Sequence, residues 1–114
     1  MNSSVAIGLL LYFLSHIIIW FQVNGQFIWT WAKDHPWIMS LLGFPISCVL
    51  IIATKYIVAG FDGLLWPGRF LGFALGISSY AVLTWFFMGE GISIKTLTSL
   101  ILALGIICVQ VFWK

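Results

Sequence analysis

Charged residues are scarce in this sequence. Only 7% of its 114 residues are charged and 62% are hydrophobic, whereas about a quarter of the residues in a soluble domain carry charge. So little charge excludes the polar surface that keeps a soluble domain in water, and it leaves no basic surface for a nucleic acid. The composition therefore indicates a membrane protein in contact with lipid, and we expect no nucleic-acid partner.

Acidic residues and cysteines are also few. The chain has three acids and two cysteines, Cys48 and Cys108, and each cysteine lies in an apolar run without CxxC spacing. The sequence contains no Ser/His/Asp set, no paired carboxylates, no phosphate-binding glycine loop and no cluster of metal ligands. We therefore expect no enzymatic activity, no catalytic residue, no metal site and no cofactor.

Long apolar runs take the place of charge. Four of them are close to the ~20 residues that a helix needs to cross a bilayer. They do not alternate in polarity as the strands of a membrane barrel do. The sequence therefore predicts one all-α domain over residues 1–114, an integral membrane bundle of four transmembrane helices with short loops. The expected helices cover about residues 5–26, 37–59, 70–89 and 94–113.

The breaks between the runs predict the topology. Asp34 is expected to cap the second helix, and Pro36 is expected in its first turn. Short links make neighbouring helices antiparallel, so both termini should lie on one side. That side holds a slight excess of basic residues, which favours both ends in the cytoplasm. The two sets are Lys55, Arg69 and Lys114 on that side, and Lys33 and Lys95 on the other.

Small and polar residues gather on one side of the first expected helix. At about 100° per residue, they fall within about 40° of one another and are flanked by a tyrosine and a histidine. Asn24 points elsewhere, toward water or a frayed helix end. Because unsatisfied polar groups are costly in hydrocarbon, this polar stripe must face the bundle interior or a partner. Its members are Gly8, Ser15, Gln22 and Gln26, with Tyr12 and His16 at its flanks.

Two explanations of the polar stripe stay open at this point. One is a set of interhelical hydrogen bonds, each contributing about 0.6 to 2 kcal/mol, and the other is the lining of a wet cavity for a solute. His16 is either a structural histidine held by a neighbouring helix or a titratable group. If protons are carried, His16 is the best candidate, because Asp34, Asp62 and Glu90 all lie at or beside the breaks.

The third expected helix has a row of residues at four-residue spacing. Gly68, Gly72 and Gly76 are followed by Tyr80 and then Thr84. Such small-xxx-small spacing favours close packing between helices in lipid. Tyr80, together with Trp85 about one turn later, is a candidate for the wall of a central chamber that faces the polar stripe.

The segment LTWFFMGEGISIKTLTSLILALGIICVQVFW, residues 83–113, resembles the carboxy-terminal third of small multidrug resistance proteins and other members of the drug/metabolite transporter superfamily. Trp85, Phe87, Gly89, Glu90 and Gly105 are in register with that pattern. The stretch SHIIIWFQVNGQF has the polar face expected of the superfamily's first helix. The resemblance implies a multi-pass protein of the cell inner membrane that forms a homodimer, parallel or antiparallel, through its fourth helix.

One position departs from the resemblance. The membrane-embedded glutamate that binds protons and cations in small multidrug resistance proteins is replaced here by His16, and an imidazole does not attract a lipophilic cation. The sequence therefore predicts a small secondary transporter that moves a small amphipathic or polar solute as a homodimer, its path lined by the polar face of the first helix. The alternative is a noncatalytic structural or assembly subunit of a larger membrane complex. The predicted substrate-binding residues are Tyr12, Ser15, His16, Gln22, Gln26, Tyr80 and Trp85.

Overall fold

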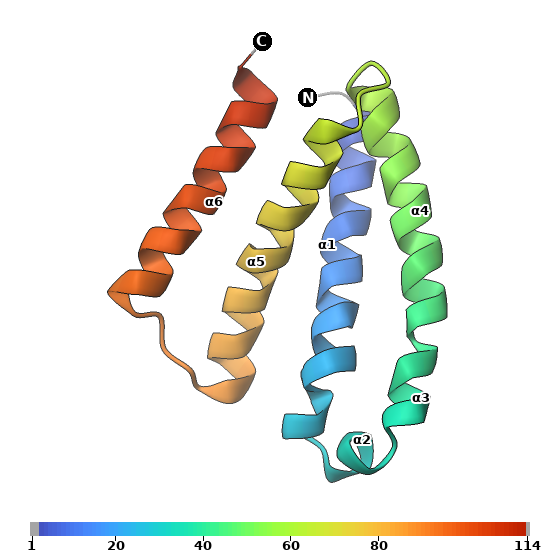
Figure 1. The fold of residues 1–114 in the computed structure, drawn as a ribbon, viewed down its shortest axis with the longest axis vertical. Helices are drawn as coiled ribbons and strands as arrows, with labels where there is room; N and C mark the ends of the chain where they lie inside the picture. The colour runs from blue at the N-terminus through green and yellow to red at the C-terminus, as the bar shows by residue number, and fades with distance from the viewer. Residues whose placement is uncertain (1–2, 114) are drawn as a thin grey trace.

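The computed structural model describes residues 3–113, and within this range the regular structure is helical and contains no strand. Four helical segments are long and apolar enough to cross a membrane (Figure 1), which confirms the predicted all-α fold with four candidate spans. The segments are Ser3–Phe27, Pro36–Gly60, Trp66–Met88 and Ile94–Phe112.

Two of these segments consist of more than one helical element. The first ends in a single 3-10 turn, and the second is divided near its start into a short and a long helix. A further short helix connects the two segments. In chain order the elements are α1 (Ser3–Asn24), η1 (Gly25–Phe27), α2 (Thr30–Asp34), α3 (Pro36–Leu41), α4 (Gly43–Gly60), α5 (Trp66–Met88) and α6 (Ile94–Phe112).

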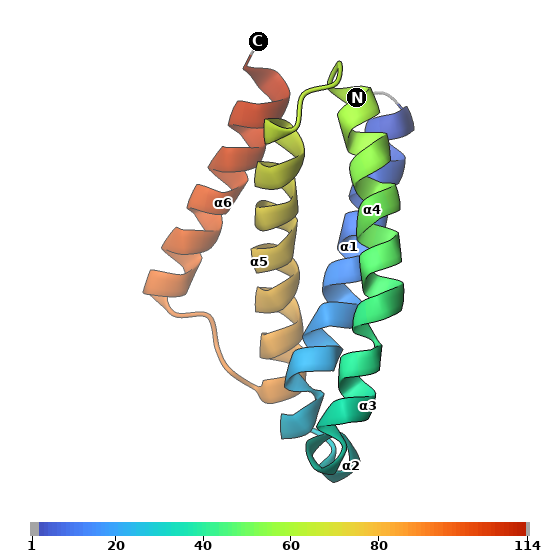
Figure 2. The same ribbon diagram turned by 45° about the vertical axis from the view of Figure 1, so that its right-hand side comes forward.

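Helix α1 is the central element of the structure. It packs along α4 on one side and along α5 on the other, whereas α4 and α5 make few direct contacts. Helix α6 packs chiefly against α5 and lies at the edge of the molecule (Figures 1 and 2). Because successive long helices run in opposite directions, α1 begins and α6 ends at the same end of the molecule, as the short links predict.

The boundary between α2 and α3 differs from the prediction. Asp34 is the last residue of α2 and does not cap the following helix; the residue before α3 is His35, whose side chain makes no capping hydrogen bond. His35 instead bonds the carbonyl oxygen of Trp31 through Nδ1 at 2.8 Å. The helix breaks here because the residue before a proline is pushed out of the α region. Pro36 lies in the first turn of α3, which confirms that prediction.

Helix α5 is longer at its start than predicted. It begins at Trp66 rather than near residue 70, and a proline, Pro67, occupies its first turn, where the missing N–H has no helical partner to lose. Arg69 therefore belongs to the helix and not to the preceding link. At its other end, α5 stops at Gly89, which has a φ of 67° in the left-handed region that glycine adopts without strain.

The buried core lies mainly between α1 and α4. Val5 and Tyr12 of α1 form one cluster with Ala53 and Ile57 of α4. Gly8 permits this close approach, because a Cβ atom there would lie 2.5 Å from Cγ1 of Ile57 and 3.1 Å from the carbonyl oxygen of Ala53. Outside the core many large apolar side chains are exposed, as expected of surfaces that face acyl chains.

We predict that Gly8→Ala weakens the packing of α1 on α4. Ile57 and Ala53 are both fully buried, so neither has room to move away from the added methyl group. Overpacking of this kind lowers stability by about 1–3 kcal/mol. The free energy of unfolding, measured by SDS titration of the protein in mild detergent, should fall by that amount.

Gly72→Ala on α5 is the matched control. The nearest atom to a Cβ at Gly72 is Cε2 of Tyr12 at 3.6 Å, an ordinary contact distance, and alanine is the better helix former. This variant should unfold at the wild-type SDS fraction or slightly above it. Equal losses in the two variants would contradict the assignment of Gly8 as the close contact.

Candidate functional site

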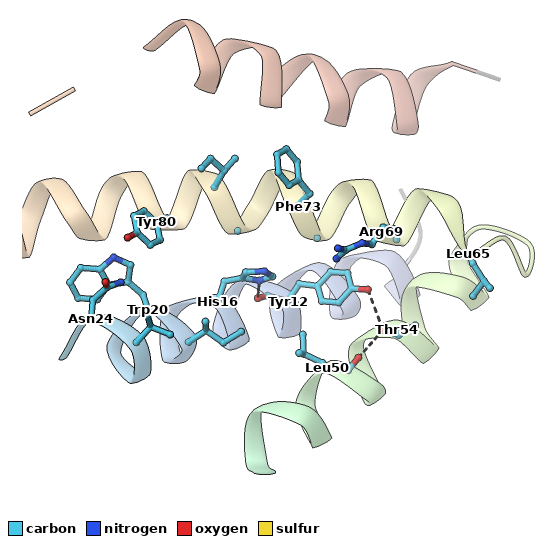
Figure 3. A pocket seen from close by; sticks show the side chains of 16 residues that line it. Tyr12, His16, Trp20, Asn24, Leu50, Thr54, Leu65, Arg69, Phe73 and Tyr80 are labelled. Atoms are coloured by element: carbon cyan, nitrogen blue, oxygen red, sulfur yellow. Dashed lines mark hydrogen bonds between the residues drawn. The ribbon is translucent and has the colours of Figure 1, made fainter. Parts of the chain in front are cut away.

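A cavity of about 650 Å³ lies where α1, α4 and α5 meet (Figure 3). Its volume is in the range of about 300–1,000 Å³ that is typical of small-molecule sites. Several lining side chains, among them Thr54 and Tyr80, remain exposed, so the cavity is open on the side away from α1. Its polar lining consists of Tyr12, His16, Asn24, Thr54, Arg69 and Tyr80.

The glycine row of α5 provides the space in which two rings of α1 lie. A Cβ atom at Gly76 would be 2.7 Å from Cδ2 of His16, and one at Gly72 would be 3.6 Å from the ring of Tyr12. Both rings therefore rest directly on the α5 backbone. The close approach expected of small-xxx-small spacing is present, but the row receives side chains, those of Tyr12 and His16 from α1 and that of Ile57 from α4 at Gly68, and not the backbone of another helix.

Tyr12 links α1 to α4 through a hydrogen bond. Its hydroxyl lies 3.2 Å from Oγ1 of Thr54, and that Oγ1 donates its own hydrogen to the carbonyl oxygen of Leu50 at 2.8 Å. Because a threonine hydroxyl has one hydrogen, Tyr12 must be the donor in the bond between the two helices. The phenol is thereby fixed at the wall of the cavity with its oxygen still able to accept.

The hydrogen bond of His16 fixes its tautomer. Nδ1 lies 2.7 Å from the carbonyl oxygen of Tyr12, and a carbonyl only accepts, so Nδ1 carries a hydrogen. In the neutral ring Nε2 is then an acceptor, and it sits beside Gly76. Binding of a proton would convert Nε2 into a donor. His16 can therefore offer a solute either polarity, depending on its charge.

Trp20 closes one end of the cavity. It is 2% exposed, its indole Nε1 donates to Oγ1 of Thr84 on α5 at 3.0 Å, and its ring lies 5.6 Å from that of Phe87. The bond to Thr84 satisfies the one polar atom of the indole. Trp20 thus contributes an apolar ring surface to the cavity and holds α1 to α5 at the same time.

The structure brings three of the seven predicted site residues together: Tyr12, His16 and Tyr80 line the cavity. Trp85 does not join them. It is 57% exposed and, being five residues beyond Tyr80, it lies about 140° around the helix from it.

The other three predicted residues also lie outside the cavity lining. Ser15 is fully buried and donates to the carbonyl oxygen of Leu11 at 2.8 Å, inside its own helix. Gln22 donates to the carbonyl oxygen of Met39 on α3 at 3.1 Å. Gln26 is exposed in the turn η1, beyond the end of α1, and donates to the carbonyl oxygen of Val23 at 2.9 Å. None of the four members of the polar stripe lines the cavity; the two flanking residues, Tyr12 and His16, do.

Asn24 is a lining residue that the sequence analysis missed. The expected helix end is present, because α1 ends at Asn24, but the expectation that Asn24 points toward water is wrong, because it is 8% exposed and borders the cavity. Its amide nitrogen Nδ2 is buried and has no hydrogen-bond partner within residues 3–113. The available signal was the four-residue spacing of Tyr12, His16, Trp20 and Asn24, all of which line the cavity.

Arg69 and Thr54 are further polar lining residues that the sequence analysis missed. Assigned to a link, Arg69 lies instead in the first turns of α5, and its side chain extends into the cavity toward α1 (Figure 3). The proline at residue 67 was the available signal, since prolines mark first turns of helices.

No family model, curated protein or solved structure matches the chain. The resemblance of residues 83–113 to small multidrug resistance proteins therefore stays a prediction. Any role for the chain has to be argued from the residues of the cavity.

We predict opposite effects for two amide-to-leucine substitutions on α1. Asn24→Leu removes a buried donor that has no partner and should raise the free energy of unfolding, by about 1–3 kcal/mol for a fully desolvated group. Gln22→Leu removes a donor to the carbonyl oxygen of Met39 and with it a hydrogen bond between α1 and α3, leaving that oxygen only its bond from the Leu42 N–H, so it should lower the same quantity. SDS titrations of both variants would test this; a loss of stability in both would contradict the unpaired state of Asn24.

Proposed function

We propose that the chain is a small multi-pass protein of the cell inner membrane that binds a small amphipathic or polar solute in the cavity and moves it across the membrane as a homodimer. The observation that carries the proposal is the cavity itself. It is bordered by polar groups from three helices, each part of a segment long and apolar enough to span a bilayer. Polar groups within membrane-spanning helices are expected only where protein packs against them or water reaches them.

The state of the lining groups favours a binding site over a purely structural role. Residues used for packing satisfy their own polar atoms, as Ser15 and Ser79 do through carbonyls one turn earlier. Asn24, in contrast, borders the cavity and has a buried donor, Nδ2, without a partner in residues 3–113. A buried donor of this kind is costly in a protein without a ligand or water at that place, so a role in binding explains its presence.

His16 is the proposed coupling group. It lies in the middle of α1 among the cavity-lining residues, and the three acids of the chain, Asp34, Asp62 and Glu90, lie outside the lining. Its Nε2 atom is the place for a transported proton. Membership of the drug/metabolite transporter superfamily is consistent with this arrangement, with the histidine in place of a glutamate.

The homodimer is proposed through α6. Ala103 is the one residue of α6 that is fully packed, against α5, while Gly105 lies about 200° around the helix from it and has open space beside it. The face that carries Gly105 is thus free to contact the same face of a second copy. Lipid would cover the remaining apolar surface.

We predict that a water-soluble thiol reagent reaches the cavity. In a variant without Cys48 and Cys108, Thr54→Cys should react with a charged methanethiosulfonate added to either side of proteoliposomes. Ile51→Cys, on the exposed apolar surface of the same helix, should not react, because a thiol in hydrocarbon does not ionise. Mass spectrometry of the modified protein gives both rates.

The alternative, a structural or assembly subunit, predicts a dry interior. Thr54→Cys would then be as unreactive as Ile51→Cys, and the proposed function would fail. Reaction of Thr54→Cys from one side only would retain the binding site but contradict transport, because a carrier must expose its site to both sides in turn.

We also predict that Cys108 forms cross-links between two copies. Cys108 is exposed and lies one turn beyond Gly105, on the same face of α6. In native membranes Cys48→Ser should give covalent dimers and Cys108→Ser should give none. A disulfide formed by copper–phenanthroline oxidation indicates a parallel pair. Cross-linking only by a longer bismaleimide indicates an antiparallel pair that crosses at Gly105, because each Cys108 then lies about 4.5 Å from the crossing in opposite directions, about 9 Å in total. Dimers through Cys48 alone would contradict contact through α6.

A further inference from the structure

The charge of the cavity is informative about its solute. Among the residues that line it, Arg69 is the one with a permanent charge, and no acid is present in the lining. Glu90 instead borders a separate hollow of about 300 Å³ between α5 and α6, together with Lys95. A lining with a guanidinium and no carboxylate repels cations and attracts anions.

The hydrogen-bonding groups at the two ends of the cavity point to the same conclusion. Arg69 lies at one end and offers only donors, while Asn24 lies at the other end with its unpaired donor Nδ2. A solute that satisfies both ends has to carry acceptors. A charged oxygen at Arg69 gives the stronger interaction, because hydrogen bonds between ionised partners are about twice as strong as neutral ones.

Between these ends the cavity is elongated and mostly apolar. Arg69 and Tyr80, both on α5, are separated by eleven residues, which corresponds to about 17 Å along the helix. Ile19, Leu50 and Ile77 contribute apolar surface from three different helices between them. Such a lining fits a hydrocarbon body that lies parallel to the helices.

We propose that the cavity binds an amphipathic oxyanion, a carboxylate or phosphate on an apolar chain, with its charged group held by Arg69 and its chain directed toward Asn24 and Tyr80. This inference rests on the proposed function and specifies the class of its solute. The charged group then lies near the membrane surface, because Arg69 is close to the start of α5. The end of the chain then lies beside Asn24, which borders the cavity away from Arg69.

The route of entry follows from the open side of the cavity. The opening lies between α4 and α5, which make few direct contacts. The long axis of the cavity runs parallel to the helices. In a spanning orientation the opening therefore faces the acyl chains along its length, and its Arg69 end lies near the aqueous phase because α5 begins there. An oxyanion reaches this opening from two sources, as a free solute dissolved in the leaflet or as the head group of an anionic lipid.

Photolabelling with three matched probes tests the proposal. The probes share one alkyl chain with a diazirine and differ in the head group, which is a carboxylate, a primary ammonium or a hydroxyl. The full-length protein is placed in phosphatidylcholine nanodiscs, and the labelled residues are located by mass spectrometry. The carboxylate probe should label cavity-lining residues at least about tenfold more than the ammonium probe, the ratio that a difference of about 1.4 kcal/mol produces.

Variants of two basic residues separate a specific site from general charge. Arg69→Gln should reduce the preference for the carboxylate probe to near one, while Arg69→Lys, which retains the charge, should keep most of it. Lys55→Gln is the matched control, because Lys55 is exposed on α4 outside the lining and its loss removes the same charge. An equal effect of Arg69→Gln and Lys55→Gln would overturn the assignment to Arg69.

Nanodiscs that contain phosphatidylglycerol identify the source of the oxyanion. A decrease in carboxylate labelling there, relative to phosphatidylcholine alone, indicates a lipid head group, and unchanged labelling indicates a free solute; both agree with an oxyanion site. Equal labelling by all three probes would overturn the oxyanion class and leave the binding cavity in place. No cavity labelling by any probe would overturn the proposed function itself.

Discussion

Two rows of side chains at four-residue spacing meet between α1 and α5, and the rest of the site depends on this contact. Tyr12 and His16 of α1 rest on Gly72 and Gly76 of α5. This is packing of one i±4 ridge against another, with the ridge of α5 reduced to bare backbone at the point of contact. Because rings and not a whole helix fill that space, room remains beside them where α1, α4 and α5 meet, and this room is the cavity.

The four candidate spans were predictable and the site was predictable only in part. Length and hydrophobicity define each span, and both are local properties of the sequence. The site depends on which side chains share a ridge. A helical wheel at 100° per residue groups Ser15 with Gln22, which are seven residues apart. The residues that line the cavity instead follow steps of four along α1, from Tyr12 to Asn24, and such a row winds slowly around the helix. Gln26 shares the angle of that face on the wheel, but α1 ends before it, at Asn24.

Polar residues within these helices have two different roles, and their hydrogen bonds distinguish them. Ser15 and Ser79 are buried and donate to carbonyls one turn earlier in their own helices, so they need no partner and no water. Tyr12 and Trp20 donate to threonines on neighbouring helices. The sequence alone does not distinguish the two roles. A serine that bonds within its own helix and a serine that lines a cavity can occupy the same position in the helical repeat. Arg69 illustrates the same limit for helix ends, since its role depends on where α5 begins.

The opening between α4 and α5 has a consequence for how binding to this protein is measured. A molecule that enters from within the leaflet is concentrated there before it meets the protein. Each additional methylene favours transfer from water into the acyl region by about 0.8 kcal/mol. In a homologous series, the apparent affinity referred to the aqueous concentration should therefore rise with chain length even where the protein contacts stay constant. Affinities expressed per mole of lipid remove this contribution and report the cavity alone.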